Sequence, residues 1–294
     1  MTLSASKFYS SGAETIDVAL ESGFFAKLKM RNGTFKLTQP SRFQELEVAF
    51  RPYVKERVVS LTEVLDVGVS TGLTTVELAR FLADCGAASR IVATDLFIEA
   101  HIVELASWFR VFCDSEGWPL QYDVWGISFR PWIRRLDYVT LAFVPLVLGR
   151  SVLWPRLRSR IRAGGSRPVQ MITRSLPSNS EIVFVENDIM CRAEDFTRRF
   201  DMVRAANILN IGYFSQEQIH SAIGNIHSYL RGPGALLILA RTNRARENAG
   251  TLFELCENGS FAALERVGGG SEIEKLVLDF RPSQLQPPSG SPHC

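Results

Sequence analysis

The stretch from residue 64 to residue 82 constrains the fold of this chain more than any other. It opens with Val64–Val69, a short and nearly uninterrupted apolar run that is typical of a strand buried on both faces of a parallel sheet. Gly68 and Gly72 then mark a tight turn, and Leu73–Leu82 follows as an amphipathic helix. Glycines and the free N–H groups of a helix start let backbone approach a ligand closely. The stretch therefore predicts an α/β fold with a ligand-binding loop.

The spacing of the glycines in this loop distinguishes between nucleotide cofactors. The dinucleotide fingerprint G-x-G-x-x-G requires a middle glycine to make room for a pyrophosphate, and this chain has Ser70 there. A nicotinamide or flavin cofactor is therefore disfavoured. The pattern D-x-G-x-x-x-G, from Asp66 to Gly72, resembles the first motif of the class I, Rossmann-like methyltransferases that use S-adenosylmethionine.

Further segments follow the loop at the intervals found in that family. Arg90–Leu96 reads as a second strand, and Asp95, 23 residues after Gly72, supplies a carboxylate that can accept both hydroxyls of a ribose. Three later segments look like the next strands of the family: Glu181–Asp188, Phe200–Asn210, and Ala235–Ala240 preceded by Leu230-Arg231-Gly232-Pro233-Gly234.

The resemblance implies a fold, a cofactor and a set of residues. The implied fold is a Rossmann-like, mostly parallel seven-stranded sheet with helices on both faces. The implied cofactor is S-adenosyl-L-methionine, with Asp95 at the ribose and Asp188 at the adenine amino group. Methyl transfer itself requires no metal. The expected cofactor-binding residues are Asp66, Gly68, Ser70, Gly72, Asp95, Leu96, Asp188, Ile189 and Asn207.

The rest of the chain is expected to surround this sheet. Residues 1–62 are predicted to form a helical cap, because Ser41 and Gln44 match a capping box and apolar residues then recur at helical spacing, at Phe43, Leu46, Phe50 and Tyr53. Residues 63–280 form the methyltransferase domain, which is expected to close with antiparallel strands at Phe261–Arg266 and Glu274–Phe280. The tail, residues 281–294, holds four prolines and is expected to be disordered.

An insertion over residues 97–180 separates the second predicted strand from the third. It begins with a predicted β-hairpin, in which Arg110–Cys113 and Pro119–Val124 flank a turn. Ser128 to Arg174 then holds ten arginines, no lysine and only Asp137 as an acidic residue, for a local net charge of +9 within a chain of +2. Embedded there is the apolar run Tyr138–Gly149, which is shorter than the roughly 20 residues of a membrane-spanning helix.

Two interpretations of this arginine-rich segment stay open. Its apolar side chains could pack as a lid over the substrate pocket, or they could make a peripheral contact with an anionic membrane, with the arginines at the lipid headgroups. Nucleic acid is not expected as a partner, because the aromatic residues Phe129, Trp132 and Tyr138 cluster at one end and are not interleaved with the arginines.

The catalytic residues and the acceptor are less constrained than the cofactor. Asn207 lies at the end of the fourth predicted strand, where ligands bind in open α/β sheets, and His101 is expected on a helix just after Asp95, near the cofactor. These two are the candidates, and no base is assigned. We expect a methyltransferase acting on a small-molecule or lipid-like acceptor. The alternatives are a non-catalytic S-adenosylmethionine-binding protein and a protein carboxyl methyltransferase, whose family the stretch from Phe200 to Ile219 also resembles.

Composition agrees with a globular protein. The 294 residues are 46% hydrophobic and 22% charged. The five cysteines show no C-x-x-C or metal-binding spacing, and the first twelve residues do not read as a signal peptide. The expected location is the cytoplasm, with membrane-peripheral placement if the arginine-rich segment contacts lipid.

Overall fold

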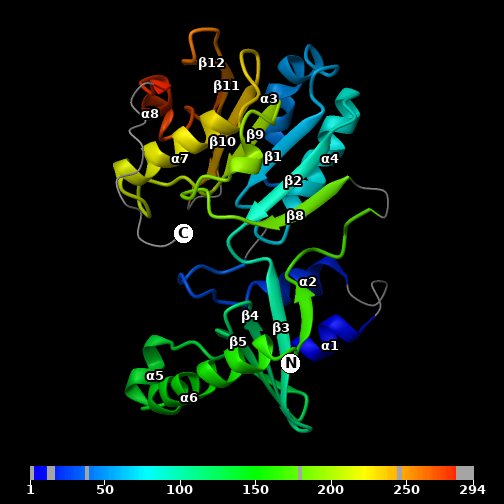
Figure 1. Ribbon diagram of the computed structural model, residues 1–294, viewed down its shortest axis with the longest axis vertical. Coiled ribbons are helices and arrows are strands. Elements are labelled where there is room, and N and C mark those ends of the chain that lie inside the picture. Colours follow the sequence, from blue (N-terminus) through cyan, green and yellow to red (C-terminus); the bar gives the residue numbers. More distant parts are fainter. Residues whose placement is uncertain (1–2, 12–16, 37–39, 178–180, 244–246, 283–294) are drawn as a thin grey trace. The chain divides into compact units, whose positions relative to one another are not determined.

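The computed structural model describes residues 3–11, 17–36, 40–177, 181–243 and 247–282. The chain folds into two compact units (Figure 1). Unit 1 combines residues 1–39 with residues 97–175, and unit 2 combines residues 40–96 with residues 176–294. The N-terminal region is thus divided between the units, in contrast to the expected continuous cap over residues 1–62.

Unit 2 contains a seven-stranded sheet with the strand order β12-β11-β10-β9-β1-β2-β8. Neighbours from β10 through β9, β1 and β2 to β8 are parallel, whereas β11 is antiparallel to both β10 and β12. The predicted Rossmann-like, mostly parallel seven-stranded sheet is confirmed. The strands are β1 (Glu63–Val67), β2 (Arg90–Asp95), β8 (Ile182–Glu186), β9 (Met202–Ala206), β10 (Leu236–Thr242), β11 (Asn248–Leu255) and β12 (Phe261–Val267).

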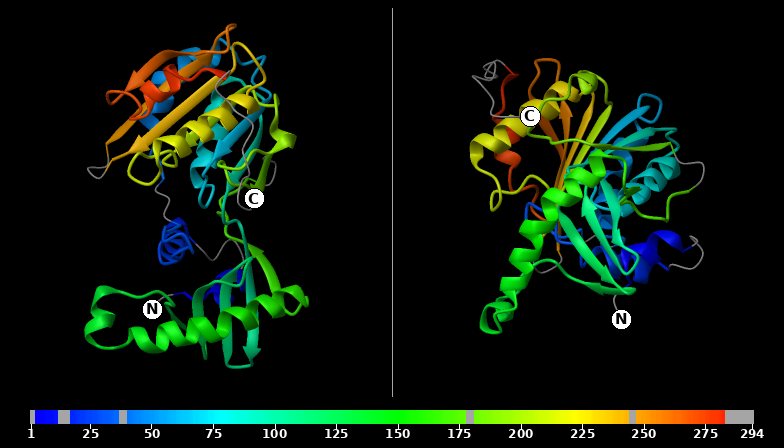
Figure 2. Two further views of the ribbon diagram at one scale, coloured as in Figure 1. Left: turned by 60° about the vertical axis from the view of Figure 1, so that its left-hand side comes forward. Right: turned by 60° about the horizontal axis from the view of Figure 1, so that its bottom comes forward.

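Helices cover both faces of this sheet, as expected (Figure 2). Successive side chains of a strand point to opposite faces, so the apolar run of β1 supplies both cores. Val64 packs with the helices on one face and Leu65 with those on the other. The first face carries α3 (Gln44–Lys55) and α4 (Leu73–Cys85); the second carries α7 (Gln216–Tyr229) and α8 (Glu274–Leu278), and a 3₁₀ turn, η2, spans Glu194–Phe196.

Two predictions about unit 2 are wrong. The segment expected as a strand at Glu274–Phe280 forms helix α8, because its buried residues Ile273, Val277 and Phe280 recur at helical spacing. The antiparallel pair is instead β11 with β12. The capping box is also absent, since α3 starts after Phe43 without a side-chain cap and Ser41 adopts a φ of 55°.

Unit 1 is built on a five-stranded antiparallel sheet with the order β6-β5-β4-β3-β7. The predicted hairpin is confirmed as β4 and β5. The strands are β3 (Glu99–Ala106), β4 (Phe109–Asp114), β5 (Pro119–Val124), β6 (Ile127–Phe129) and β7 (Arg167–Gln170), and the helices are α1 (Ala5–Ser10), α2 (Val18–Phe25), α5 (Arg135–Val139) and α6 (Phe143–Arg162).

The two N-terminal helices complete the core of unit 1. Phe8 of α1 stacks on Phe24 of α2 with ring centroids 4.1 Å apart, and both pack against Phe112 of β4. The backbone N–H of Ala5 donates to Oε1 of Gln121 on β5 at 2.7 Å. Residues 1–39 are therefore part of the same folded unit as the insertion.

The predicted disordered tail lies outside the described residues from position 283 onward. Within the described ranges, none of the helices combines the length and the hydrophobicity needed to cross a bilayer. The same ranges contain no group of three or more histidine, cysteine or acidic side chains placed to hold a metal ion.

Candidate functional site

The loop between β1 and α4 has an unusual backbone. Gly68, Ser70 and Gly72 have φ angles of 74°, 56° and 78°, in the left-handed region that favours glycine. A β-carbon at Gly72 would lie 2.5 Å from the ring of Phe184 on β8, and one at Gly68 would lie 2.8 Å from Cδ1 of Ile208. The two glycines therefore allow the side chains of Phe184 and Ile208 to close against the loop.

Hydrogen bonds tie this loop to the end of β2. The N–H groups of Gly68 and Val69 donate to the carbonyl of Thr94 at 2.7 and 3.1 Å. Ser70 N–H donates to Oδ2 of Asp95 at 2.7 Å. The carboxylate predicted to hold the ribose thus lies directly against the glycine loop, at the carboxyl end of its strand.

Asp66 makes a buried ion pair with Arg204, a residue that the sequence analysis did not single out. Nε and Nη2 of Arg204 donate to the two carboxylate oxygens at 2.8 and 2.6 Å, and Thr75 adds a third hydrogen bond at 2.7 Å. Arg204 also donates to the carbonyl of Thr74 at 2.9 Å. The pair joins β1, β9 and the first turn of α4. Asp66 therefore stabilises the loop from the buried interior of unit 2.

The residues predicted after β8 have different environments. Oδ1 of Asp188 accepts from the N–H of Met190 at 2.9 Å, which fixes its side chain in a local turn. Ile189 is buried in the core beneath α7, and its carbonyl accepts from Nδ2 of Asn225 at 2.7 Å. Asp188 is therefore the residue of this pair whose side chain faces away from the core.

Asn207 follows β9 and adopts a left-handed φ of 61°. Its N–H donates to the carbonyl of Ala240, and its Oδ1 accepts from the N–H of Thr242 at 2.7 Å. The side chain thus links the ends of β9 and β10. Leu96, which follows β2, is 41% exposed.

The strand order brings most of the predicted residues to one edge of the sheet. Asp95 ends β2, and Gly68, Ser70, Asp188 and Asn207 follow the carboxyl ends of β1, β8 and β9; these four strands are consecutive in the sheet. The chain progresses outward from β1 in both directions, so β1 and β9 form a topological switch point, the place where open α/β sheets bind ligands. Their contact with a cofactor stays a prediction.

His101 does not lie on a helix after Asp95, and that prediction is wrong. It belongs to strand β3 of unit 1, where its Nδ1 lies 3.0 Å from Oγ of Ser166. Burial lowers the pKa of its imidazole. Residues 99–106 form a strand because small or apolar side chains alternate with polar ones at its start, where Ala100 and Ile102 are buried.

A second group of ionisable residues accompanies the Asp66–Arg204 pair on the α3 face. Burial raises the pKa of Glu47 to about 7, an effect that Arg204 partly opposes and Glu77 reinforces. Nε of Arg42 is buried without a hydrogen-bond partner among the described residues, and burial lowers the pKa of this guanidinium. The sequence signal for Glu47 was a carboxylate between buried Leu46 and Phe50 on the same helix.

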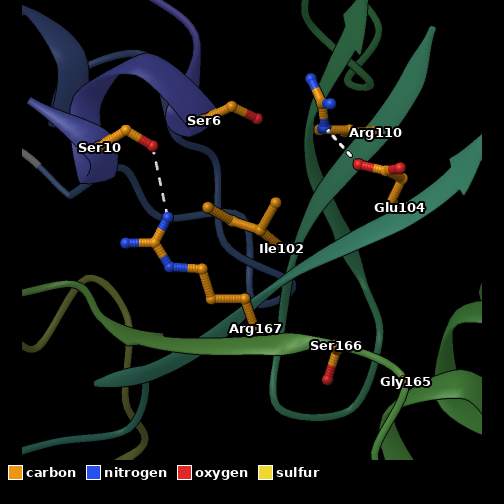
Figure 3. A pocket seen from close by; sticks show the side chains of 8 residues that line it. All are labelled: Ser6, Ser10, Ile102, Glu104, Arg110, Gly165, Ser166 and Arg167. Atoms are coloured by element: carbon orange, nitrogen blue, oxygen red, sulfur yellow. Dashed lines mark hydrogen bonds and ion pairs between the residues drawn. The ribbon is translucent and has the colours of Figure 1, made fainter. Parts of the chain in front are cut away.

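Unit 1 has a surface depression of about 570 Å³ beside α1, β3 and β4 (Figure 3). The cationic side chains at its wall are already engaged. Arg167 donates to the carbonyl of Tyr9 at 2.9 Å, and Arg110 pairs with Glu104 at 2.8 Å. The lining residues are Ser6, Ser10, Ile102, Glu104, Arg110, Gly165, Ser166 and Arg167.

No protein-family model matches the sequence, and no curated protein matches it. Among solved structures, the chain is similar to the CMeT domain of the citrinin polyketide synthase, with 16% identity, a TM-score of 0.28, and coverage of 61% of this chain and 28% of that chain. It is similar to the PH0226 protein of Pyrococcus horikoshii, with 11% identity, a TM-score of 0.34, and coverage of 85% and 83%. It is also similar to PigF with SAH, with 12% identity, a TM-score of 0.29, and coverage of 68% and 38%.

The aligned part spans about a quarter of the length of the CMeT domain structure and well under half of PigF. TM-scores below 0.5 do not establish membership of a family. The residues at the carboxyl edge of the sheet are therefore the guide to function.

Proposed function

We propose that unit 2 binds S-adenosylmethionine at the carboxyl ends of β1 and β2 and transfers its methyl group to a small-molecule or lipid-like acceptor. The observation that carries this proposal is the contact between Ser70 N–H and the carboxylate of Asp95, which places an acidic acceptor beside a glycine turn at the switch point of the sheet. A carboxylate in this position suits the two hydroxyls of a ribose.

The residues present fit a nucleoside better than a dinucleotide. Gly68 and Gly72 shape the turn, but position 70 carries a side chain where the dinucleotide loop requires glycine. In this assignment Asp95 holds the ribose, Asp188 lies toward the base, and the Asp66–Arg204 pair keeps the loop in its conformation. Ile189 supports the site through packing in the core, since its side chain is buried.

When bound, the cofactor would supply an electrophilic methyl group on a sulfonium, so the protein has mainly to align the acceptor and exclude water. Asn207 is the candidate on the acceptor side. Its Oδ1 is held by Thr242, which fixes the orientation of the amide, and Nδ2 is not used in that bond. No general base is assigned, and the reaction requires no metal.

Calorimetry with S-adenosylhomocysteine and NAD tests the cofactor assignment. We expect S-adenosylhomocysteine to bind and NAD to bind weakly or not at all. Asp95→Ala should weaken binding about tenfold to a hundredfold, because a charged acceptor of two hydroxyls is lost. Asp84→Ala, at an exposed position on α4, is the matched control and should leave affinity unchanged. Unchanged affinity in a folded Asp95→Ala protein would place the cofactor elsewhere.

A turnover assay separates the enzyme from a non-catalytic binding protein. The purified chain is incubated with cell extract and with donor labelled in the methyl group, and the products are fractionated. Label in small molecules or lipids supports the proposal. Label in base-labile protein esters would indicate a carboxyl methyltransferase, and binding without any transfer would indicate a non-catalytic role.

A further inference from the structure

Helix α6 has two apolar faces, although a helix on one sheet needs only one. Leu153, Leu157 and Ile161 recur every four residues and pack on Val103 and Val111 of the unit 1 sheet. This face anchors the helix, which runs across the sheet as a long green helix in Figures 1 and 2.

The opposite face of α6 carries a second series with the same spacing. Val144, Leu148 and Val152 are 42%, 60% and 51% exposed. The exposed Arg156 and Arg160 follow on the adjoining flank of the helix, because each step of four residues turns about 40° around the axis. Residues four apart lie on one side of a helix. The outward face is therefore apolar over the first half of the helix, and two exposed arginines flank it in the second half.

Helix α5 and the turn that follows it add exposed apolar residues next to the start of α6, where Tyr138 stacks on Phe143 with ring centroids 5.1 Å apart. Leu136, Val139 and Leu141 are 72%, 81% and 65% exposed, and Tyr138 is exposed beside them. We call the outward face of α6, the flanking Arg156 and Arg160 and these residues together the α5–α6 surface. Isolated exposed apolar residues are ordinary, whereas a contiguous series of them marks an interaction site.

The single acidic residue of the segment does not neutralise this surface. Asp137 is buried and accepts two hydrogen bonds from Arg130, at 2.7 and 2.6 Å, and one from the N–H of Arg134. The hydrogen bonds from Arg130 lower the pKa of Asp137 to about 2. Arg158 pairs with Glu116 at 2.8 Å, but Arg156 and Arg160 have no carboxylate within ion-pair distance in the described part of the chain.

We propose that the α5–α6 surface docks on an anionic lipid bilayer, with its apolar half inserted at the interface and its arginines at the phosphate groups. Charge complementarity selects this partner. A second copy would bring the same excess of arginines against itself, and a nucleic acid would leave the exposed aliphatic side chains without partners. Apolar residues beside arginines are the combination that interfacial helices use on anionic membranes. This proposal does not depend on the methyl-transfer proposal.

Vesicle co-sedimentation of the full chain tests the proposal. We expect binding to vesicles of phosphatidylcholine with one third phosphatidylserine, weak binding to phosphatidylcholine alone, and a fall in binding as salt rises, since screening shortens to about 8 Å at physiological ionic strength. No binding to the anionic vesicles at low salt, or equal binding to both compositions, would overturn it.

Substitutions on the α5–α6 surface test whether this surface makes the contact with the vesicles. Arg156→Gln with Arg160→Gln should weaken binding about twenty- to thirtyfold, at about fivefold per arginine, and flatten its salt dependence. Leu148→Ser should weaken binding with the salt dependence preserved. Arg80→Gln and Val59→Ser, at exposed positions in unit 2, are the matched controls and should bind normally. Equal effects of test and control variants would contradict the assignment, as would a dimer in sedimentation velocity that Leu148→Ser dissociates.

Discussion

The guanidinium of Arg204 and the carboxylate of Asp66 lie side by side in the interior of unit 2, joined by two hydrogen bonds of 2.8 and 2.6 Å. Both side chains are almost fully buried, at 4% and 2% exposure. Removing one partner of such a pair leaves an uncompensated charge out of water.

Arg204→Met is therefore expected to lower the free energy of unfolding by about 3–5 kcal/mol, measured by denaturant titration. Arg204→Met combined with Asp66→Asn should recover part of this loss, because the unpaired charge is removed. Arg80→Met, on the exposed side of α4, serves as the control and should change stability by less than about 0.5 kcal/mol. A loss below about 1 kcal/mol for Arg204→Met would show that the pair is not needed to hold the loop.

Gly72→Ala should destabilise the loop for two separable reasons. The left-handed φ of 78° costs about 1–2 kcal/mol for a residue with a β-carbon, and the methyl group meets Phe184 at 2.5 Å. Adding Phe184→Leu should relieve the steric part and leave the backbone part. Thermal unfolding of the two single variants and the double variant measures this coupling; strictly additive effects would mean that Phe184 does not limit the space at position 72.

Glu47 should make stability depend on pH between about 4.5 and 7. Its folded pKa is raised to about 7 by burial, so within this window the folded protein keeps a proton that the unfolded chain has lost. The free energy of unfolding therefore falls as pH rises through the window.

Glu47→Gln should remove this fall. Between pH 5 and pH 8 the free energy of unfolding of the variant should therefore rise by about 1–2 kcal/mol relative to that of the wild type. This figure allows for the partial solvent exposure of Glu47. Denaturant titrations at both pH values measure the gain. Glu45→Gln, at an exposed position of the same helix, is the control. Parallel stability curves for Glu47→Gln and the wild type would contradict the assignment.

Asn207 combines a left-handed backbone with an amide that holds the N–H of Thr242. Asn207→Gly keeps the backbone freedom and removes the amide, whereas Asn207→Ala also strains the backbone. If the amide acts on the acceptor side, Asn207→Gly should reduce turnover several-fold with little change in the affinity for S-adenosylhomocysteine. Equal losses in turnover and affinity would place Asn207 at the cofactor instead.

The strands of unit 2 could largely be predicted because buried parallel strands leave continuous apolar runs, such as Val64–Val69, and their ends carry the polar residues of the site. The partner of Asp66 was missed, although an arginine inside the apolar segment Met202–Ala206 is itself a sign that a buried charge needs a counter-ion. Helix α8 was mistaken for a strand because five residues contain little more than one helical turn.

The set of chain segments that make up unit 1 could not be predicted in the same way. Its helices α1 and α2 pair with strands about a hundred residues later in the chain, through contacts such as Ala5 with Gln121. Local patterns predict elements, but they do not predict which distant segments will cover one another's apolar faces.

The interleaving of the two units along the chain has a consequence for biosynthesis. Phe8 and Phe24 leave the ribosome long before Phe112, the ring they pack against, and the strand β7 that completes their sheet is made only at residues 167–170. Unit 2 is interrupted in turn, since β1 and β2 emerge more than eighty residues ahead of β8. Neither core can close during most of translation, and nascent aromatic side chains must be shielded until the chain is well past its midpoint. A nascent chain stalled near residue 96 should accordingly recruit chaperones more strongly than one stalled after residue 267.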